Sequence, residues 1–128
     1  MAKGIKMNIV LWIVQVLLAI AFLMAGVTHG FQQEKAKAQF KWPADVAPPV
    51  LTFIGSAEIL GAIGLILPAL TGILPWLTPL AALGLAVIMV LAVIFHLTRR
   101  ENQAIVLNLV LLVLAAFVAY GRWVLVPL

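Results

Sequence analysis

The sequence predicts an all-α protein, a membrane-spanning four-helix bundle in up-down-up-down order with both termini on one side. Hydrophobic residues make up 66% of the chain and charged residues only 9%, against about 25% charged residues in soluble domains. The apolar residues form four runs, each close to the roughly 20 residues that cross a bilayer. Most charged residues lie between these runs or near the chain ends. We therefore expect residues 1–128 to form a single transmembrane domain.

The first helix is predicted over residues 8–31. Lys3 and Lys6 precede its apolar run, which gives the start of the chain some likeness to a signal peptide. The run exceeds the about 7–15 apolar residues of a signal-peptide core, and no clear small-x-small cleavage site follows it. We therefore expect a retained transmembrane helix.

The second helix is predicted over residues 49–67 and is bounded by prolines. Residues 32–47 before it form the one long connector, and the sequence is compatible with either a helical turn or a short hairpin there. Pro48 and Pro49 suit the start of a helix, because its first N–H groups have no intrahelical partners. Pro68 marks the predicted end.

The third and fourth helices are predicted over residues 76–97 and 104–123. Gly72 and Pro75 punctuate the uncharged turn before the third helix. A short charged loop, residues 98–103, separates the third helix from the fourth. Four crossings of this kind return the C-terminus to the side of the N-terminus.

Tryptophans and arginines are expected at the membrane interfaces, where aromatic belts and head-group contacts form. Positive residues are more numerous on the loop side, which favours cytoplasmic loops, whereas Lys3 and Lys6 before the first helix favour the reverse. The sequence therefore leaves the membrane orientation open. The expected interface anchors are Trp12, Trp42, Trp76, Trp123, Arg99 and Arg100.

The composition excludes some functions. The net charge of +4 does not indicate nucleic-acid binding, because the positive residues lie where they meet lipid head groups. The chain has no cysteine, which excludes disulfides, thiolate nucleophiles and iron–sulfur ligation by its own residues. Whether the protein is an enzyme stays open, and a complete enzyme on its own is the less favoured interpretation.

Glu58 is the one charged residue in its apolar run. A lone carboxylate in hydrocarbon costs roughly 2.5–3.5 kcal/mol on insertion scales, and such residues usually mark a functional site. At a rise of about 1.5 Å per residue, Glu58 lies in the loop-side half of the membrane, together with His29, His96 and Asn108 from the other three helices. We predict that these four residues form a polar ligand-binding site. The alternative for Glu58 is a structural latch between two helices.

Small residues accompany this polar cluster. Gly26 and Gly30 form a GxxxG pair, and Gly55 and Gly61 lie on or near the face of the second helix that carries the acid. Small residues let helices approach closely, so these four glycines are predicted as packing positions, within one bundle or in a homo-oligomer. The acid and the two histidines could form a metal-binding set, but none has the local spacing of a metal motif, so no metal is predicted.

Three segments carry a family resemblance. Residues 54–68 (IGSAEILGAIGLILP) resemble the second-helix signature of the DoxX-like family, and residues 25–31 (AGVTHGF) and 93–97 (VIFHL) fit the same pattern. The resemblance implies a small four-helix integral membrane protein in which Glu58 is a shared feature. One departure is His29, at a position where relatives are expected to carry Lys.

The resemblance also bears on function. The family takes its name from a subunit linked to a thiosulfate:quinone oxidoreductase, and distant eukaryotic relatives resemble assembly factors for membrane proteins. We therefore expect an accessory subunit of a membrane redox system, with quinone as the candidate cofactor, in a bacterial inner (plasma) membrane. The alternatives are an assembly or chaperone-like partner and a small transporter that uses Glu58 as a proton carrier. The expected partners are the lipid bilayer and either another membrane protein or a second copy of the chain.

Overall fold

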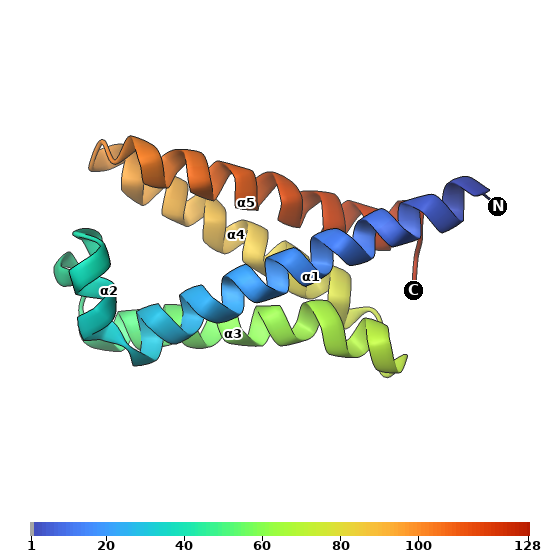
Figure 1. Ribbon diagram of the computed structural model, residues 1–128, viewed down its shortest axis with the longest axis horizontal. Coiled ribbons are helices and arrows are strands. Elements are labelled where there is room, and N and C mark those ends of the chain that lie inside the picture. The colour runs from blue at the N-terminus through green and yellow to red at the C-terminus, as the bar shows by residue number, and fades with distance from the viewer. Residues whose placement is uncertain (1) are drawn as a thin grey trace.

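The computed structural model describes residues 2–128, with side chains from Gly4 onward, and this part of the chain is helical without a strand (Figure 1). The predicted all-α fold class is confirmed, and four helices are long and apolar enough to cross a membrane. The elements in chain order are α1 (Ala2–Phe31), α2 (Gln33–Gln39), the 3₁₀ helix η1 (Trp42–Asp45), α3 (Pro48–Thr71), α4 (Leu77–Thr98), α5 (Asn102–Tyr120) and the π-helical turn η2 (Gly121–Leu125).

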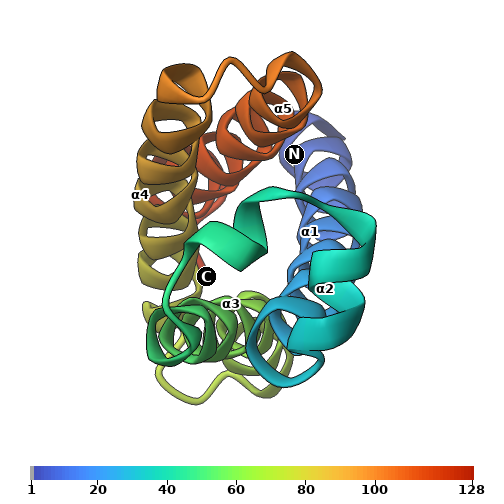
Figure 2. The same ribbon diagram turned by 90° about the vertical axis from the view of Figure 1, so that its left-hand side faces the viewer.

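The four long helices run alternately up and down, so the bundle has two distinct ends. The terminus end carries the C-terminus and the start of α1, and the loop end carries α2, η1 and the α4–α5 loop (Figure 1). Helix α1 packs along α3, α4 packs along α5, and α3 contacts α4. Helix α1 crosses α5 toward the terminus end, so the two pairs diverge toward the loop end, where α2 and η1 lie across the opening (Figures 1 and 2).

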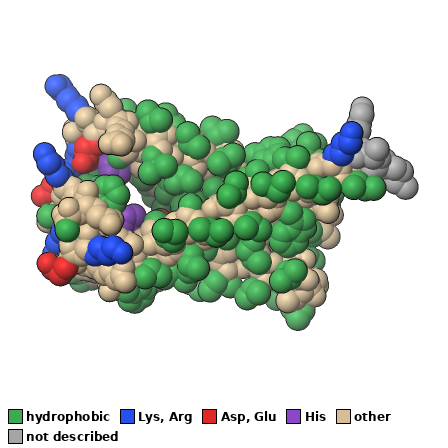
Figure 3. Space-filling model, in the orientation of Figure 1, with side chains coloured by type: hydrophobic (Ala, Val, Ile, Leu, Met, Phe, Trp, Pro, Cys, Tyr) green, Lys and Arg blue, Asp and Glu red, His purple; other side chains and the backbone are tan. Residues whose placement is uncertain are grey.

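The core is narrow and the outer surface is apolar. Leu18, Phe22, Leu65, Leu85 and Val118 are fully buried between the helices. Large aliphatic and aromatic side chains cover the outside along most of the bundle (Figure 3). An exposed apolar surface of this extent requires lipid as its solvent. The chain is therefore an integral, multi-pass membrane protein in contact with the bilayer.

Helices α1 and α3 touch through their backbones. A Cβ atom added to Gly26 would lie 2.6 Å from the Gly55 carbonyl oxygen, and one added to Gly30 would lie 3.1 Å from Gly55 Cα. Gly61 makes a similar approach on the α4 side, where an added Cβ would lie 2.5 Å from Leu85 Cδ2. These glycine faces are filled by the bundle's own helices.

Helix α3 continues about one turn beyond the end predicted from Pro68 and stops at Gly72, whose φ is 72°. Proline lacks the N–H that would bond the carbonyl of the residue four positions earlier, which is Gly64. The Thr78 hydroxyl from α4 donates to that carbonyl oxygen at 2.9 Å. A side chain of the next helix thus replaces the lost backbone hydrogen bond, and the helix passes through Pro68.

Candidate functional site

A cavity of about 610 Å³ opens at the loop end, where the two helix pairs diverge. All four long helices line it, together with the connector that includes α2 and η1. Figure 3 shows a hollow at this end with histidine side chains on its rim. Glu58, His29, His96 and Asn108 all line this cavity, so the structure brings together the four polar residues that the sequence places at one depth.

Glu58 is buried, with 3% of its surface exposed. With the carboxylate ionised, the Nδ1–H of His29 donates to its Oε1 at 3.1 Å. Within residues 2–128, the second carboxylate oxygen makes no hydrogen bond. A buried carboxylate needs a donor to offset the loss of water, and His29 supplies one from α1. One oxygen is therefore held while the other has no protein partner.

His96 and Trp42 form the opposite wall. His96 is 4% exposed, and its Nδ1–H donates to Glu101 Oε1 at 3.0 Å. The Trp42 ring lies edge-on to both histidines, with centroids 4.9 Å from His29 and 5.7 Å from His96. Asn108 also lines the cavity, and within the described chain its amide makes no side-chain hydrogen bond. The cavity thus has a polar end with unused hydrogen-bonding groups and an aromatic wall.

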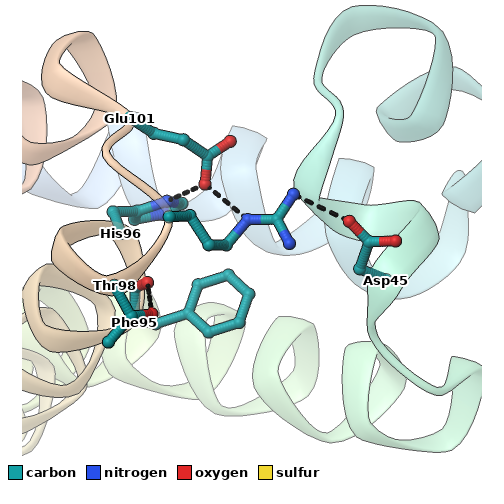
Figure 4. Close-up of polar contacts among 6 residues, drawn as sticks. Asp45, Phe95, His96, Thr98 and Glu101 are labelled. Atoms are coloured by element: carbon teal, nitrogen blue, oxygen red, sulfur yellow. Dashed lines mark hydrogen bonds and ion pairs between the residues drawn. The ribbon is translucent and has the colours of Figure 1, made fainter.

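Arg99 ties the connector to the α4–α5 loop. Its Nη2 lies 2.7 Å from Asp45 Oδ2 in η1, its Nε donates to Glu101 Oε1 at 2.7 Å, and its guanidinium stacks over the Phe95 ring (Figure 4). The hydrogen bond from His96, followed by that from Arg99, holds the pKa of Glu101 below its usual range. The carboxylates of Glu101 and Asp45 raise the pKa of Arg99. This bridge holds η1, and with it Trp42, against the cavity.

The pKa of Glu101 predicts a pH-dependent stability. A carboxyl group with a lowered pKa in the folded state stabilises the fold above its unfolded pKa, and this contribution is lost as pH falls through the folded value. Near pH 7 we expect the free energy of unfolding of wild type to exceed that of Glu101→Gln by under about 1 kcal/mol, because the bridge is partly exposed. Wild type should therefore melt at the higher temperature. The difference should shrink as the pH falls below the ordinary glutamate pKa of about 4.3 and should disappear once the pH is below the lowered folded value. Melting curves of both proteins across pH test this, and a difference that persists in acid would contradict it.

The structure also locates the residues expected at the membrane interfaces. Trp42, one of the expected interface anchors, stands between the two histidines, and Arg99, another, contacts η1. Glu101 shares a seven-residue spacing with Asn108, the one sequence signal that could have drawn attention to it. At the terminus end, the Trp76 and Trp123 side chains are about half exposed, as lipid-facing residues are. Within residues 2–128 no three His, Asp or Glu side chains gather into a metal-binding group.

The match to known families covers most of the chain. A family model described as the DoxX-like family matches residues 13–118. The chain belongs to the DoxX-like family. The matched region begins within α1 and ends within α5, so it contains every residue that lines the loop-end cavity. The η2 turn lies outside the matched region. No significant match was found among curated proteins or among solved structures.

Proposed function

We propose that this DoxX-like protein is an accessory subunit of a quinone-linked membrane redox system and that its loop-end cavity holds the quinone head group. The observation that carries this proposal is a cavity of about 610 Å³ with a polar end and an apolar body. That volume lies within the about 300–1,000 Å³ typical of small-molecule sites, which combine apolar walls with a few placed polar groups.

The chemistry of the lining matches a quinone. A quinone head is a flat ring with two carbonyl acceptors, and Trp42, Phe53 and Phe95 line the cavity with aromatic surface. The Asn108 amide has N–H groups to donate to a carbonyl. His29, on the facing helix pair, has its Nδ1 held by Glu58 and its other ring nitrogen free of side-chain partners within the described residues. Asn108 can donate to one carbonyl, and the protonated form of His29, which also carries an Nε2–H, can donate to the other from the opposite wall.

The apolar tail of a quinone also has a route. The lining includes Phe53 and Leu91, which are 75% and 62% exposed on the outer surface of the bundle. Because this surface faces lipid, a ligand dissolved in the bilayer can reach the cavity between helices. Reduction of a quinone takes two electrons and two protons, and the titratable pair of Glu58 and His29 lies where protons would be exchanged. The electrons come from the redox partner, and we place this assembly in a bacterial inner membrane.

The assembly-factor alternative has less support in this fold. It uses the glycine faces to dock another protein's helix, yet Gly26, Gly30 and Gly55 are covered by the contact between α1 and α3. A homo-oligomer built on the same faces meets the same obstacle. The cavity, in contrast, is open within the described residues.

Filling the cavity tests the proposal directly. The purified protein, titrated with a short-tailed benzoquinone, should bind it with saturable quenching of the tryptophan fluorescence, to which Trp42 in the cavity wall contributes. Ala57→Phe places a ring in the cavity, since Ala57 lines it, and should weaken binding about tenfold or more by steric exclusion. Ala116→Phe, on the exposed face of α5, is the matched control and should bind as wild type does. Absence of saturable binding to wild type, or equal binding by both variants, would refute the site.

A further inference from the structure

Arg122 is buried at the terminus end, far along the bundle from the loop-end cavity. It belongs to η2 and is 2% exposed. Its Nε donates to Gln15 Oε1 at 2.7 Å, and its Nη1 donates to Asn8 Oδ1 at 2.8 Å and to the Val126 carbonyl at 3.3 Å. Its Nη2 is buried and has no hydrogen-bond partner within the described chain. The guanidinium is thus anchored on two sides and has one free donor group.

Within the described residues, no acidic side chain pairs with this positive charge. The chain contains four acidic residues in all, and every one lies in the loop-end half, where none bonds Arg122: Glu34, Asp45, Glu58 and Glu101. The atoms that Arg122 does contact are neutral amide oxygens. A buried charge without a counter-charge is costly, so an anion that enters the adjoining cavity would stabilise Arg122.

The local structure holds Arg122 in this position. The π-helical turn closes with the Val126 N–H donating to the Gly121 carbonyl at 2.7 Å, and Gly121 packs directly on Leu11 of α1. The Gln15 side chain is fixed because its Nε2 donates to the Leu65 carbonyl at 2.7 Å, which turns its oxygen toward Arg122. π-helical turns are rare and are frequent at functional sites. Contacts within η2, with α1 and, through Gln15, with α3 therefore fix the guanidinium before any ligand binds.

A cavity gives an anion access to this arginine. About 430 Å³ in volume, it is lined by the polar side chains of Arg122 and Asn8 and by the apolar residues Ile5, Val126, Pro127 and Leu128. A Cβ added to Gly4, another lining residue, would meet nothing within 4 Å, so the opening beside α1 is clear. The Arg122 guanidinium lies 5.7 Å from the Trp12 ring, and tryptophan marks the depth of the lipid head groups.

We propose that Arg122 binds the phosphate of an anionic phospholipid at the terminus end. Arginine suits phosphate because its planar set of N–H donors matches the phosphate oxygens. The apolar lining residues suit the glycerol and upper acyl chain of a lipid better than they suit a free ion or a carboxylate carried by a polar segment. The exposed Lys6 on the same end of α1 adds to the attraction for a negative head group.

Lipid titration followed by native mass spectrometry tests this site in the full-length protein. Wild type in detergent should retain one phosphatidylglycerol in preference to phosphatidylcholine and to a phosphate-free glycolipid. Arg122→Gln should weaken phosphatidylglycerol binding about tenfold or more, because hydrogen bonds to a charged group are lost, and Arg122→Lys should keep part of it. Lys6→Gln, which removes an exposed charge at the same end, is the matched control and should stay within about twofold of wild type.

Each other outcome overturns the proposal. Equal retention of the three lipids by wild type would exclude a phosphate site, and this readout does not depend on how the variants fold. An equal loss in Lys6→Gln and Arg122→Gln would reduce the effect to general surface charge. Displacement of the lipid by inorganic phosphate alone would make free phosphate the ligand. A stoichiometric co-purifying protein, with no lipid retained, would mean that a partner's carboxylate neutralises Arg122.

Discussion

Replacing Glu58 with Leu should weaken quinone binding by about tenfold or more while leaving the stability of the bundle unchanged or raised. The carboxylate fixes the His29 ring through Nδ1 at 3.1 Å, so without it the ring is free to turn away from the ligand. Losing the hydrogen bond from a charged His29 to the quinone would cost about 1.5 kcal/mol or more, which is roughly tenfold or more in affinity. Removing a carboxylate from hydrocarbon also relieves an insertion cost of roughly 2.5–3.5 kcal/mol. Binding and stability should therefore move in opposite directions.

The opposite effects on quinone binding and on stability distinguish a functional acid from a structural latch between helices. A latch would lose stability on Glu58→Leu, by about 0.6–2 kcal/mol for a hydrogen bond between membrane helices. Thr78→Val is the matched control: it deletes a buried hydrogen bond, 2.9 Å long, to the Gly64 carbonyl, and it should lower stability without touching quinone affinity. Thermal melts and quinone titrations of both variants decide the question. A Glu58→Leu protein that is less stable but binds quinone as wild type does would show that Glu58 is a structural latch, and it would refute a role for Glu58 in quinone binding.

The same acid bears on the transporter alternative. A proton carrier must gain and lose a proton, and Glu58→Gln abolishes that step while it keeps a side chain of similar shape. Substrate uptake that survives this substitution would exclude Glu58 as the carrier. In contrast, the quinone site predicts a change in ligand affinity without any requirement for transport.

The membrane fold could be predicted from the sequence because its signal is strong and local. Four apolar runs, each near the thickness of a bilayer, leave one plausible class of architecture, and the rise per residue of a helix sets the depth of each polar side chain. Depth on a straight helix is nearly fixed by residue number. For this reason the sequence alone suffices to place Glu58, His29, His96 and Asn108 at one end of the bundle.

The positions of Trp42 and Arg122 could not be predicted in the same way. Trp42 lies in a connector whose conformation depends on the contact between Asp45 and Arg99, and no periodic pattern encodes a contact of that kind. Arg122 follows Asn108 by 14 residues, which is two heptads, but η2 winds as a π-helix, so the contacts of Arg122 with Gln15 and Asn8 follow from a local irregularity. Contacts between segments far apart in the chain leave little trace in hydrophobic periodicity.

The largest loss of stability is expected from Gly55→Ala. An added Cβ would lie 2.5 Å from the Gly26 carbonyl oxygen and 2.5 Å from Gly30 Cα, and both are backbone atoms that cannot turn aside. Helices α1 and α3 would have to separate, at a cost near the upper end of the about 1–3 kcal/mol typical of overpacking. The separation would also part His29 from Glu58, since these residues flank the crossing, so quinone affinity should fall with stability.

Gly84→Ala provides the matched control for this substitution. Gly84 also lies within a transmembrane helix, α4, but a Cβ there would meet nothing within 4 Å. Alanine should therefore leave the bundle unchanged or stabilise it by roughly 0.5–1 kcal/mol, through the lower backbone entropy of its unfolded state. Detergent-titration unfolding of both variants measures the difference. Because the two substitutions are chemically identical, a Gly55→Ala protein as stable as Gly84→Ala would mean that α1 and α3 do not meet through their backbones. It would also contradict the packing that brings His29 next to Glu58.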